Sequence, residues 1–269
     1  MWRTPITTFV SLVAVVAASP QPGPRSHGRA EARPGGAALM IPARVGPARG
    51  SVPDSDEVAL GAALVAQFDA DRGVASTPET RRIEAYLQGV ADALGRHTRR
   101  RLPWRVHFDP HPGIKSAFAL PGGQIVVWGG ILAYMTTEDE AAALIAHEIA
   151  HVDDGQVSRR LDSLRTTRHR DVRAPGPWRW GEFGASYGPT LEYRCDSLGA
   201  ALAVRAGYAP YAYRTLLESF VALGRVHAPA APPARELTDR IAQIEREIAA
   251  EHWEGRTRTR PLQLPGAGD

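Results

Sequence analysis

The first half of the folded region shows helix-like and then strand-like spacing of apolar positions. Residues 55–72 and 78–97 repeat apolar side chains at helical spacing, and Thr77-Pro78 supplies a cap followed by proline at the first helical position. The segment "WRVHFD" at 104–109 alternates apolar and polar residues, as a strand does. The segment "SAFALPGGQIVVWGG" at 116–130 predicts a hairpin that turns at its Pro-Gly-Gly.

The second half is dominated by helical spacing. Residues 137–153 predict a helix capped by Thr137, with Glu140 three residues further on as the partner in a capping box. Because this segment is apolar on nearly all sides, we expect the helix to be buried. Further helices are predicted at about 190–206, 209–223 and 235–252.

Both ends of the chain differ in composition from the middle. Residues 1–19 combine Arg3 with an apolar stretch too short to span a bilayer comfortably, which is typical of a secretory signal peptide. We expect its removal, with an uncleaved anchor as the alternative, and a periplasmic or secreted mature chain without a transmembrane span. Residues 20–54 are rich in Pro, Gly, Ala and Arg and predict a flexible linker. The folded domain is expected over 55–253 and a disordered tail over 254–269.

The overall composition permits a globular domain and argues against two other classes. Apolar residues make up 43% of the 269 residues, enough for a real core. The 32 basic residues are scattered and nearly matched by 29 acidic ones, so no nucleic-acid partner is expected. The single cysteine, Cys195, excludes an intrachain disulfide and a multi-cysteine zinc site.

The helix at 137–153 carries an unexpected polar group in the run "AALIAHEIAHVDDG". His147 and His151 are four residues apart, so their imidazoles lie on one helical face and can bind one zinc ion. Glu148 lies roughly 100° around the helix, where its carboxylate can take a proton from a water at the metal. Burying three such side chains without partners would cost several kcal/mol, and a metal removes that cost. The pattern predicts a zinc peptidase.

A third ligand has to come from elsewhere in the chain. The extended motif of the metzincins needs glycine and histidine where this sequence has Asp154 and Val157, so that class is excluded. Glu192 and Asp196 share one helical face further on, and Gly199 continues nearly the same face with a small side chain that allows close helix approach. Glu192 can therefore complete the ligand set, and Asp196 can accept a ring N–H from a ligand histidine.

Three other residues are rival candidates. His169 and Glu182 lie in the loop between the two motifs and are alternative third ligands. Cys195 lies between the two acidic residues, and we interpret it as a small buried residue in preference to a thiolate ligand.

Three motifs in order resemble the M48 zinc metallopeptidases: "AFALPGGQIVVWGGIL", "EDEAAALIAHEIAHV" and "EYRCDSLGAALAVRAGYAP". That family includes bacterial periplasmic quality-control proteases, a mitochondrial inner-membrane stress protease and membrane-embedded prenyl-protein proteases. The resemblance covers roughly residues 56–252. It implies an α+β fold of the gluzincin type, mainly helical, with a small β-sheet beside the active-site helix.

The resemblance also implies roles for particular residues. His147, His151 and Glu192 correspond to the ligands of one Zn²⁺ ion, Glu148 to the catalytic base and Asp196 to the supporting acid. The strand segments at 117–120 and 124–127 resemble the region beside the cleft, where an extended peptide could add as a strand.

The sequence departs from the family pattern at several positions. Ser116 stands where asparagine is usual, Cys195 where alanine is usual, and Gln156 where a histidine often follows the first motif. Near the end, Arg240 fits the family's arginine, and we expect it to contact the substrate or the transition state. The histidine six residues before that arginine is replaced by Ala234, and His227 is nearby but misaligned.

These observations favour a secreted or periplasmic zinc endopeptidase that hydrolyses unfolded or misassembled polypeptides. The alternative is a catalytically weak M48-like chaperone or scaffold that binds unfolded chains, and an aminopeptidase or other zinc hydrolase ranks third. Peripheral association with a membrane is compatible with the sequence. The segment 165–188 is predicted to be a long loop, and Trp178 and Trp180 suggest a flap over the cleft that grips peptide. The alternative is a disordered surface insertion.

Overall fold

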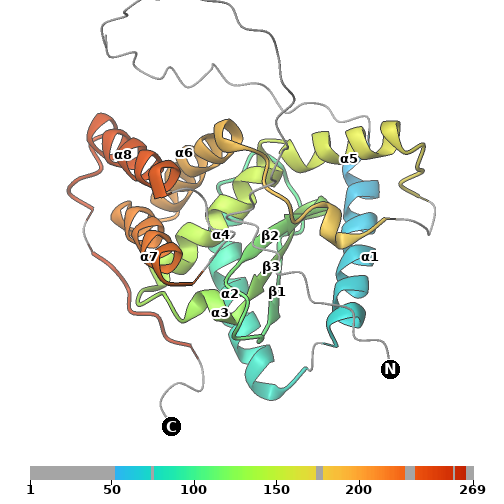
Figure 1. Ribbon diagram of the computed structural model, residues 1–269, viewed down its shortest axis with the longest axis horizontal. Helices are drawn as coiled ribbons and strands as arrows, with labels where there is room; N and C mark the ends of the chain where they lie inside the picture. The colour runs from blue at the N-terminus through green and yellow to red at the C-terminus, as the bar shows by residue number, and fades with distance from the viewer. Residues whose placement is uncertain (1–51, 74–75, 174–177, 228–233, 257, 265–269) are drawn as a thin grey trace, which may run out of the picture.

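The computed structural model describes most of the chain beyond its N-terminal fifth (Figure 1). The described residues are 52–73, 76–173, 178–227, 234–256 and 258–264. The predicted signal peptide at 1–19 and all but the last residues of the predicted linker lie outside them. Within the described part, no helix has the length and apolar character needed to cross a membrane.

The first half forms two helices and a three-stranded sheet. Its elements are α1 (Asp54–Arg72), α2 (Pro78–Gly95), β1 (Arg105–Asp109), β2 (Ala117–Leu120), the 3₁₀ turn η1 (Pro121–Gly123), β3 (Gln124–Trp128) and α3 (Gly129–Leu132). The strand order is β1-β3-β2, with β1 parallel and β2 antiparallel to β3. The predicted hairpin is confirmed, and both of its turn glycines have positive φ (73° at Gly122 and 87° at Gly123), which glycine adopts without strain.

The second half is helical. Its elements are α4 (Glu138–Asp153), α5 (Gln156–Thr167), the 3₁₀ turn η2 (Trp180–Glu182), α6 (Pro189–Arg205), α7 (Tyr211–His227) and α8 (Ala234–Ala250). The predicted helix over 137–153 is confirmed, and its capping box between Thr137 and Glu140 is formed in both directions.

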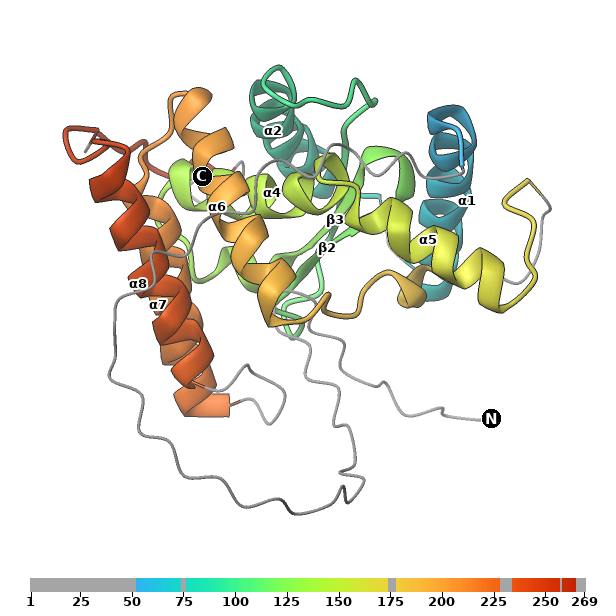
Figure 2. The same ribbon diagram turned by 90° about the horizontal axis from the view of Figure 1, so that it is seen from above.

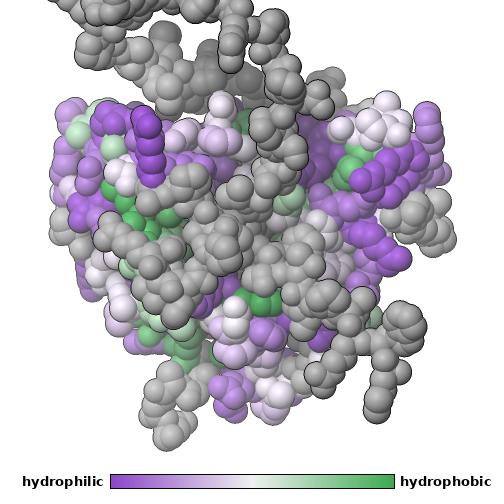
Figure 3. Space-filling model, viewed as in Figure 1, coloured by the Kyte–Doolittle hydropathy of each residue, from purple (hydrophilic) through white to green (hydrophobic). Residues whose placement is uncertain are grey.

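Helix α4 is the centre of the molecule. It packs against β2 of the sheet on one side and against α6 and α7 on another. In Figures 1 and 2, α1 and α5 lie at one end of the molecule and α6, α7 and α8 at the other, with α4 and the sheet between them. Every α4 residue from Asp139 to Val152 is buried. Among the coloured residues of Figure 3, hydrophilic side chains prevail and hydrophobic ones form small separate areas. The fold class is therefore α+β, as predicted.

The segment predicted as the loop 165–188 is more structured than expected. Helix α5 continues to Thr167, and the indole of Trp178 is only 3% exposed. Trp180 lies edge-on to Phe68 of α1, with ring centroids 5.1 Å apart. Because both indoles pack against the body of the domain, the structure does not present them as the free peptide-gripping side chains that we predicted.

The C-terminal segment also differs from expectation. We predicted a disordered tail over 254–269, but Pro261 forms a β-bridge with Thr137. The N–H of Glu138 donates to the carbonyl of Arg260 (2.9 Å), and the N–H of Arg260 donates to the buried Asp139 carboxylate (2.6 Å). This described part of the tail supplies an acceptor to the first turn of α4, whose N–H groups have no partner within the helix.

Candidate metal centre

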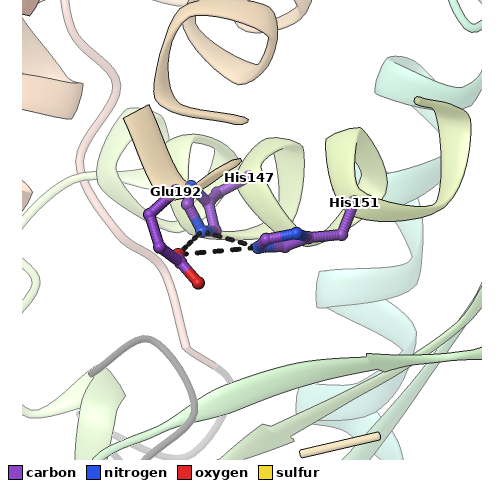
Figure 4. Close-up of side chains that lie close together, drawn as sticks. All are labelled: His147, His151 and Glu192. Atoms are coloured by element: carbon purple, nitrogen blue, oxygen red, sulfur yellow. Dashed lines mark hydrogen bonds and ion pairs between the residues drawn. The ribbon is translucent and has the colours of Figure 1, made fainter. Parts of the chain in front are cut away.

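Three side chains from two helices converge on one point (Figure 4). His147 and His151 extend from α4 and Glu192 from the first turn of α6. The Nε2 atoms of the two histidines are 3.1 Å apart, and Glu192 Oε2 lies 3.2 Å from Nε2 of His147 and 3.7 Å from that of His151. Four-coordinate zinc with bonds of about 2.0–2.1 Å separates its ligand atoms by roughly 3.3 Å. The three donors therefore fit one zinc ion, and all three residues are buried.

The other ring nitrogen of each histidine is held by a neighbour, which leaves Nε2 for the metal. His151 Nδ1 lies 2.9 Å from Oε1 of Gln156, a carbonyl oxygen that can only accept, so the ring donates there. His147 Nδ1 lies 2.5 Å from the Tyr213 hydroxyl and 3.1 Å from Asp196 Oδ1. Such contacts fix the ring orientation and the tautomer of metal-binding histidines.

Behind His147 lies a buried ion pair between Arg240 and Asp196. The guanidinium of Arg240 makes two bonds to the Asp196 carboxylate, Nε–Oδ2 at 2.5 Å and Nη2–Oδ1 at 2.6 Å. Burial raises the pKa of Asp196, but Arg240 and His147 outweigh it and hold the pKa below its usual value. The structure thus places Asp196 beside the ligand histidine and Arg240 behind Asp196, while the contact of Arg240 with substrate or transition state stays a prediction.

Glu192 is fixed by the turn that precedes α6. Its second oxygen, Oε1, accepts hydrogen bonds from the Ser186 hydroxyl (3.0 Å) and from the N–H of Tyr187 (3.1 Å). Burial raises the pKa of Glu192, but the two histidines lower it well below the usual value. The group is therefore a carboxylate with one oxygen anchored and the other directed at the histidines.

Glu148 is buried beside this ligand set, only 3% exposed. Burial raises the pKa of its carboxyl group, while the two histidines and a hydrogen bond from the backbone of Ala119 lower it. The net direction is upward, which suits a group that must accept and later release a proton. Ala119 belongs to β2, so the carboxylate faces the edge strand of the sheet.

Of the rival ligands, His169 and Glu182 are not part of this cluster, and Cys195 Sγ contacts only the outer ring nitrogen of His151, Nδ1, at 3.3 Å. His169 is exposed, and Glu182 forms ion pairs with Arg168 and Arg170. Cys195 is fully buried and its Sγ accepts from the Gln156 amide. Burial raises the pKa of the Cys195 thiol well above its usual value, which disfavours a thiolate ligand.

Two residues that hold the site were not recognised in the sequence as its members. In the sequence, Gln156 was noted only because it replaces a histidine that often follows the first motif in the family. Tyr213 gave no signal, because a tyrosine on an amphipathic helix is indistinguishable from an ordinary core residue.

A helix with His-Glu-x-x-His, a glutamate from a second helix and a short sheet beside them define a zinc-peptidase type of domain. Comparison with known proteins agrees. The model of peptidase family M48 matches residues 78–167, which include α4 but end before Glu192.

Two curated relatives are similar to parts of this chain. The mitochondrial metalloendopeptidase OMA1 of Schizosaccharomyces pombe is 48% identical over 52 residues, which cover 19% of this chain and 14% of that protein. The protein of the same name from Arabidopsis thaliana is 26% identical over 142 residues, 46% of this chain and 27% of that protein. The chain thus matches well under half the length of these relatives. Together with the family match, they support a metalloendopeptidase of the M48 type.

Proposed function

We propose that this chain is a zinc-dependent endopeptidase that hydrolyses peptide bonds of unfolded or misassembled proteins. The observation that carries the proposal is the convergence of two imidazole nitrogens and one carboxylate oxygen within 3.1–3.7 Å, next to a buried glutamate. Zinc bound there would supply Lewis-acid activation of water and of the scissile carbonyl.

The chain's own residues supply the proton transfers and the alignment. Glu148 takes the proton of the attacking water and delivers it to the nitrogen of the leaving amine. Asp196 and Gln156 keep the two histidine rings in place while charge changes at the site.

We infer that an extended substrate binds along the sheet. Strand β2 is at an edge of the three-stranded sheet, next to α4. Ala119 is the β2 residue whose backbone meets the Glu148 carboxylate. A peptide that adds to this edge by backbone hydrogen bonds would pass beside the catalytic glutamate. Recognition through the backbone suits unfolded chains, because it requires an extended conformation and depends little on which side chains the substrate carries.

The location is proposed from the sequence pattern of residues 1–19. Its short positive region and apolar stretch support export to the periplasm or the medium. The two relatives are mitochondrial by name, so they do not support a periplasmic location.

Cleavage of casein by the purified protein tests the proposal, with Glu148→Gln as the matched variant. Glutamine preserves size and the hydrogen bond to the β2 backbone but cannot accept the water's proton. We expect casein cleavage to fall by about 10²–10⁴-fold, with unchanged zinc content and thermal stability. Cleavage by the variant at near wild-type rate would show that Glu148 is not the base.

A further inference from the structure

We propose that Tyr187 is a further catalytic residue, whose hydroxyl donates a hydrogen bond to the scissile carbonyl oxygen as negative charge develops on it. The inference rests on the proposed peptidase function. It assigns a role to a side chain that neither the sequence motifs nor the ligand set includes.

The first observation is a buried hydroxyl with no hydrogen-bond partner. Among the described residues, the Tyr187 hydroxyl oxygen is shielded from solvent and makes no hydrogen bond. Buried tyrosine hydroxyls usually find a partner, and an unpaired polar atom in a native structure calls for an explanation. A substrate atom that arrives during the reaction is such an explanation.

The second observation is where this side chain lies. The Tyr187 ring stacks on the imidazole of His151, with centroids 4.6 Å apart and an interplanar angle of 27°. Its backbone N–H donates to Glu192, and its hydroxyl interacts electrostatically with the carboxylates of Glu148 and Glu192. Tyr187 therefore contacts two of the three proposed ligands, one through its ring and one through its backbone.

The third observation is that Tyr187 is held rigidly. The guanidinium of Arg160 lies over the tyrosine ring, 3.8 Å from its centroid. The same guanidinium donates to the carbonyl oxygens of Ala185 (2.5 Å) and Ser186 (2.8 Å). Arg160 is thus a positioning residue that fixes both the ring and the turn before α6. A donor that stabilises a developing oxyanion is effective when it is fixed in place beforehand.

Two other side chains with polar donors lie close to the ligands, and of these only Arg240 keeps a donor nitrogen, Nη1, buried without a partner. The Arg240 guanidinium is bound to Asp196, and the Tyr213 hydroxyl lies between Asp196 and His147. An ordinary tyrosine hydroxyl keeps its proton at neutral pH and can donate it to an oxyanion. The geometry favours Tyr187 over Arg240, because Tyr187 contacts two proposed ligands directly and Arg240 reaches His147 only through Asp196.

The experiment compares Tyr187→Phe with the wild type in the full, zinc-loaded chain. A fluorogenic peptide is built around a casein bond that the wild type cleaves, and kcat, KM, zinc dissociation constant and Tm are measured. Loss of one donor to the oxyanion should lower kcat by about 10²–10³-fold. KM, zinc affinity by competition with a chelator, and Tm should stay close to wild type, because only an unpaired hydroxyl is removed.

The contrasting variant is Tyr213→Phe, which removes a hydroxyl that touches a ligand histidine. It should weaken zinc binding by about 10–100-fold, with activity recovered by excess zinc. If Tyr187→Phe keeps its kcat within about threefold, or loses activity that excess zinc restores, the proposed role of Tyr187 is wrong. Absence of cleavage by the wild type itself would instead contradict the peptidase function, and this inference with it.

Discussion

His147 is the residue at which charge, burial and metal binding meet. Burial lowers the pKa of its imidazole, but the hydrogen bonds and charges of Asp196 and Glu192 prevail and raise the pKa to about 9, from an ordinary value of 6.5. In the metal-free protein the ring is therefore a cation between two carboxylates, and a zinc ion has to displace its proton.

This arrangement predicts opposite effects of pH on folding and on zinc binding. A raised pKa in the folded state contributes stability below about pH 6.5, and that contribution is lost as the pH rises through about 9. The Tm of the metal-free protein should fall by several degrees over that window, while its zinc affinity rises. Thermal melts and chelator competition across this range provide the check, with His147→Ala as the variant in which the fall in Tm should flatten. A Tm that holds or rises with pH would contradict this assignment of charge.

At the scale of elements, the site depends on how closely α6 approaches α4. Gly199 of α6 faces the backbone of α4: a Cβ at this position would lie 3.0 Å from the backbone nitrogen of His147 and 3.1 Å from its Cα. Because backbone atoms cannot rotate away, a larger side chain must push the two helices apart. Such a displacement separates Glu192 from the histidines.

We predict that Gly199→Val destabilises the protein by about 1–3 kcal/mol and weakens zinc binding. The matched control is Gly89→Val in α2, where an added Cβ meets no atom within 4 Å. Because valine and glycine differ little in helix propensity, Gly89→Val should be nearly neutral. Equal Tm values and zinc affinities for the two variants would show that the close approach of α6 has no part in forming the site.

The elements that local signals specify were predicted well. The hairpin was indicated by its Pro-Gly-Gly turn, and α4 by its capping box and apolar spacing. Helix α5 was not predicted, because polar residues dominate it and its buried apolar face shows only in Val157 and Leu161. The packing of Trp178 and Trp180 depends on α1, more than a hundred residues away in sequence, so no local pattern could reveal it.

At the scale of the whole molecule, sequence spacing predicted the metal ligands but not the residues that surround them. His147, Glu148 and His151 share a short motif, and Glu192 was chosen because an acidic pair recurs four residues apart. The partners Tyr213, Gln156 and Arg240 come from different elements, and their roles follow only from the way those elements pack. Arg240 is an example, since the pairing of its guanidinium with Asp196 depends on the packing of α8 against α6.

The tail shows the same dependence on tertiary structure. Its composition is that of a flexible segment, yet residues 258–264 pair with the start of α4 through Pro261 and Leu262. The tail bonds to an N–H group and to the buried Asp139 carboxylate in the first turn of α4. The sequence of the tail itself indicates neither contact.

The central claim is that His147, His151 and Glu192 together hold one zinc ion. Its most direct test is the zinc content of the purified full chain by elemental analysis, for the wild type, Glu192→Ala and Glu182→Ala. Glu182 is the matched control, an acidic residue of η2 that is paired with Arg168 and Arg170. We predict about one zinc per chain for the wild type and for Glu182→Ala, and a loss of most of it in Glu192→Ala. Stoichiometric zinc in Glu192→Ala, or its loss in Glu182→Ala, would contradict the account.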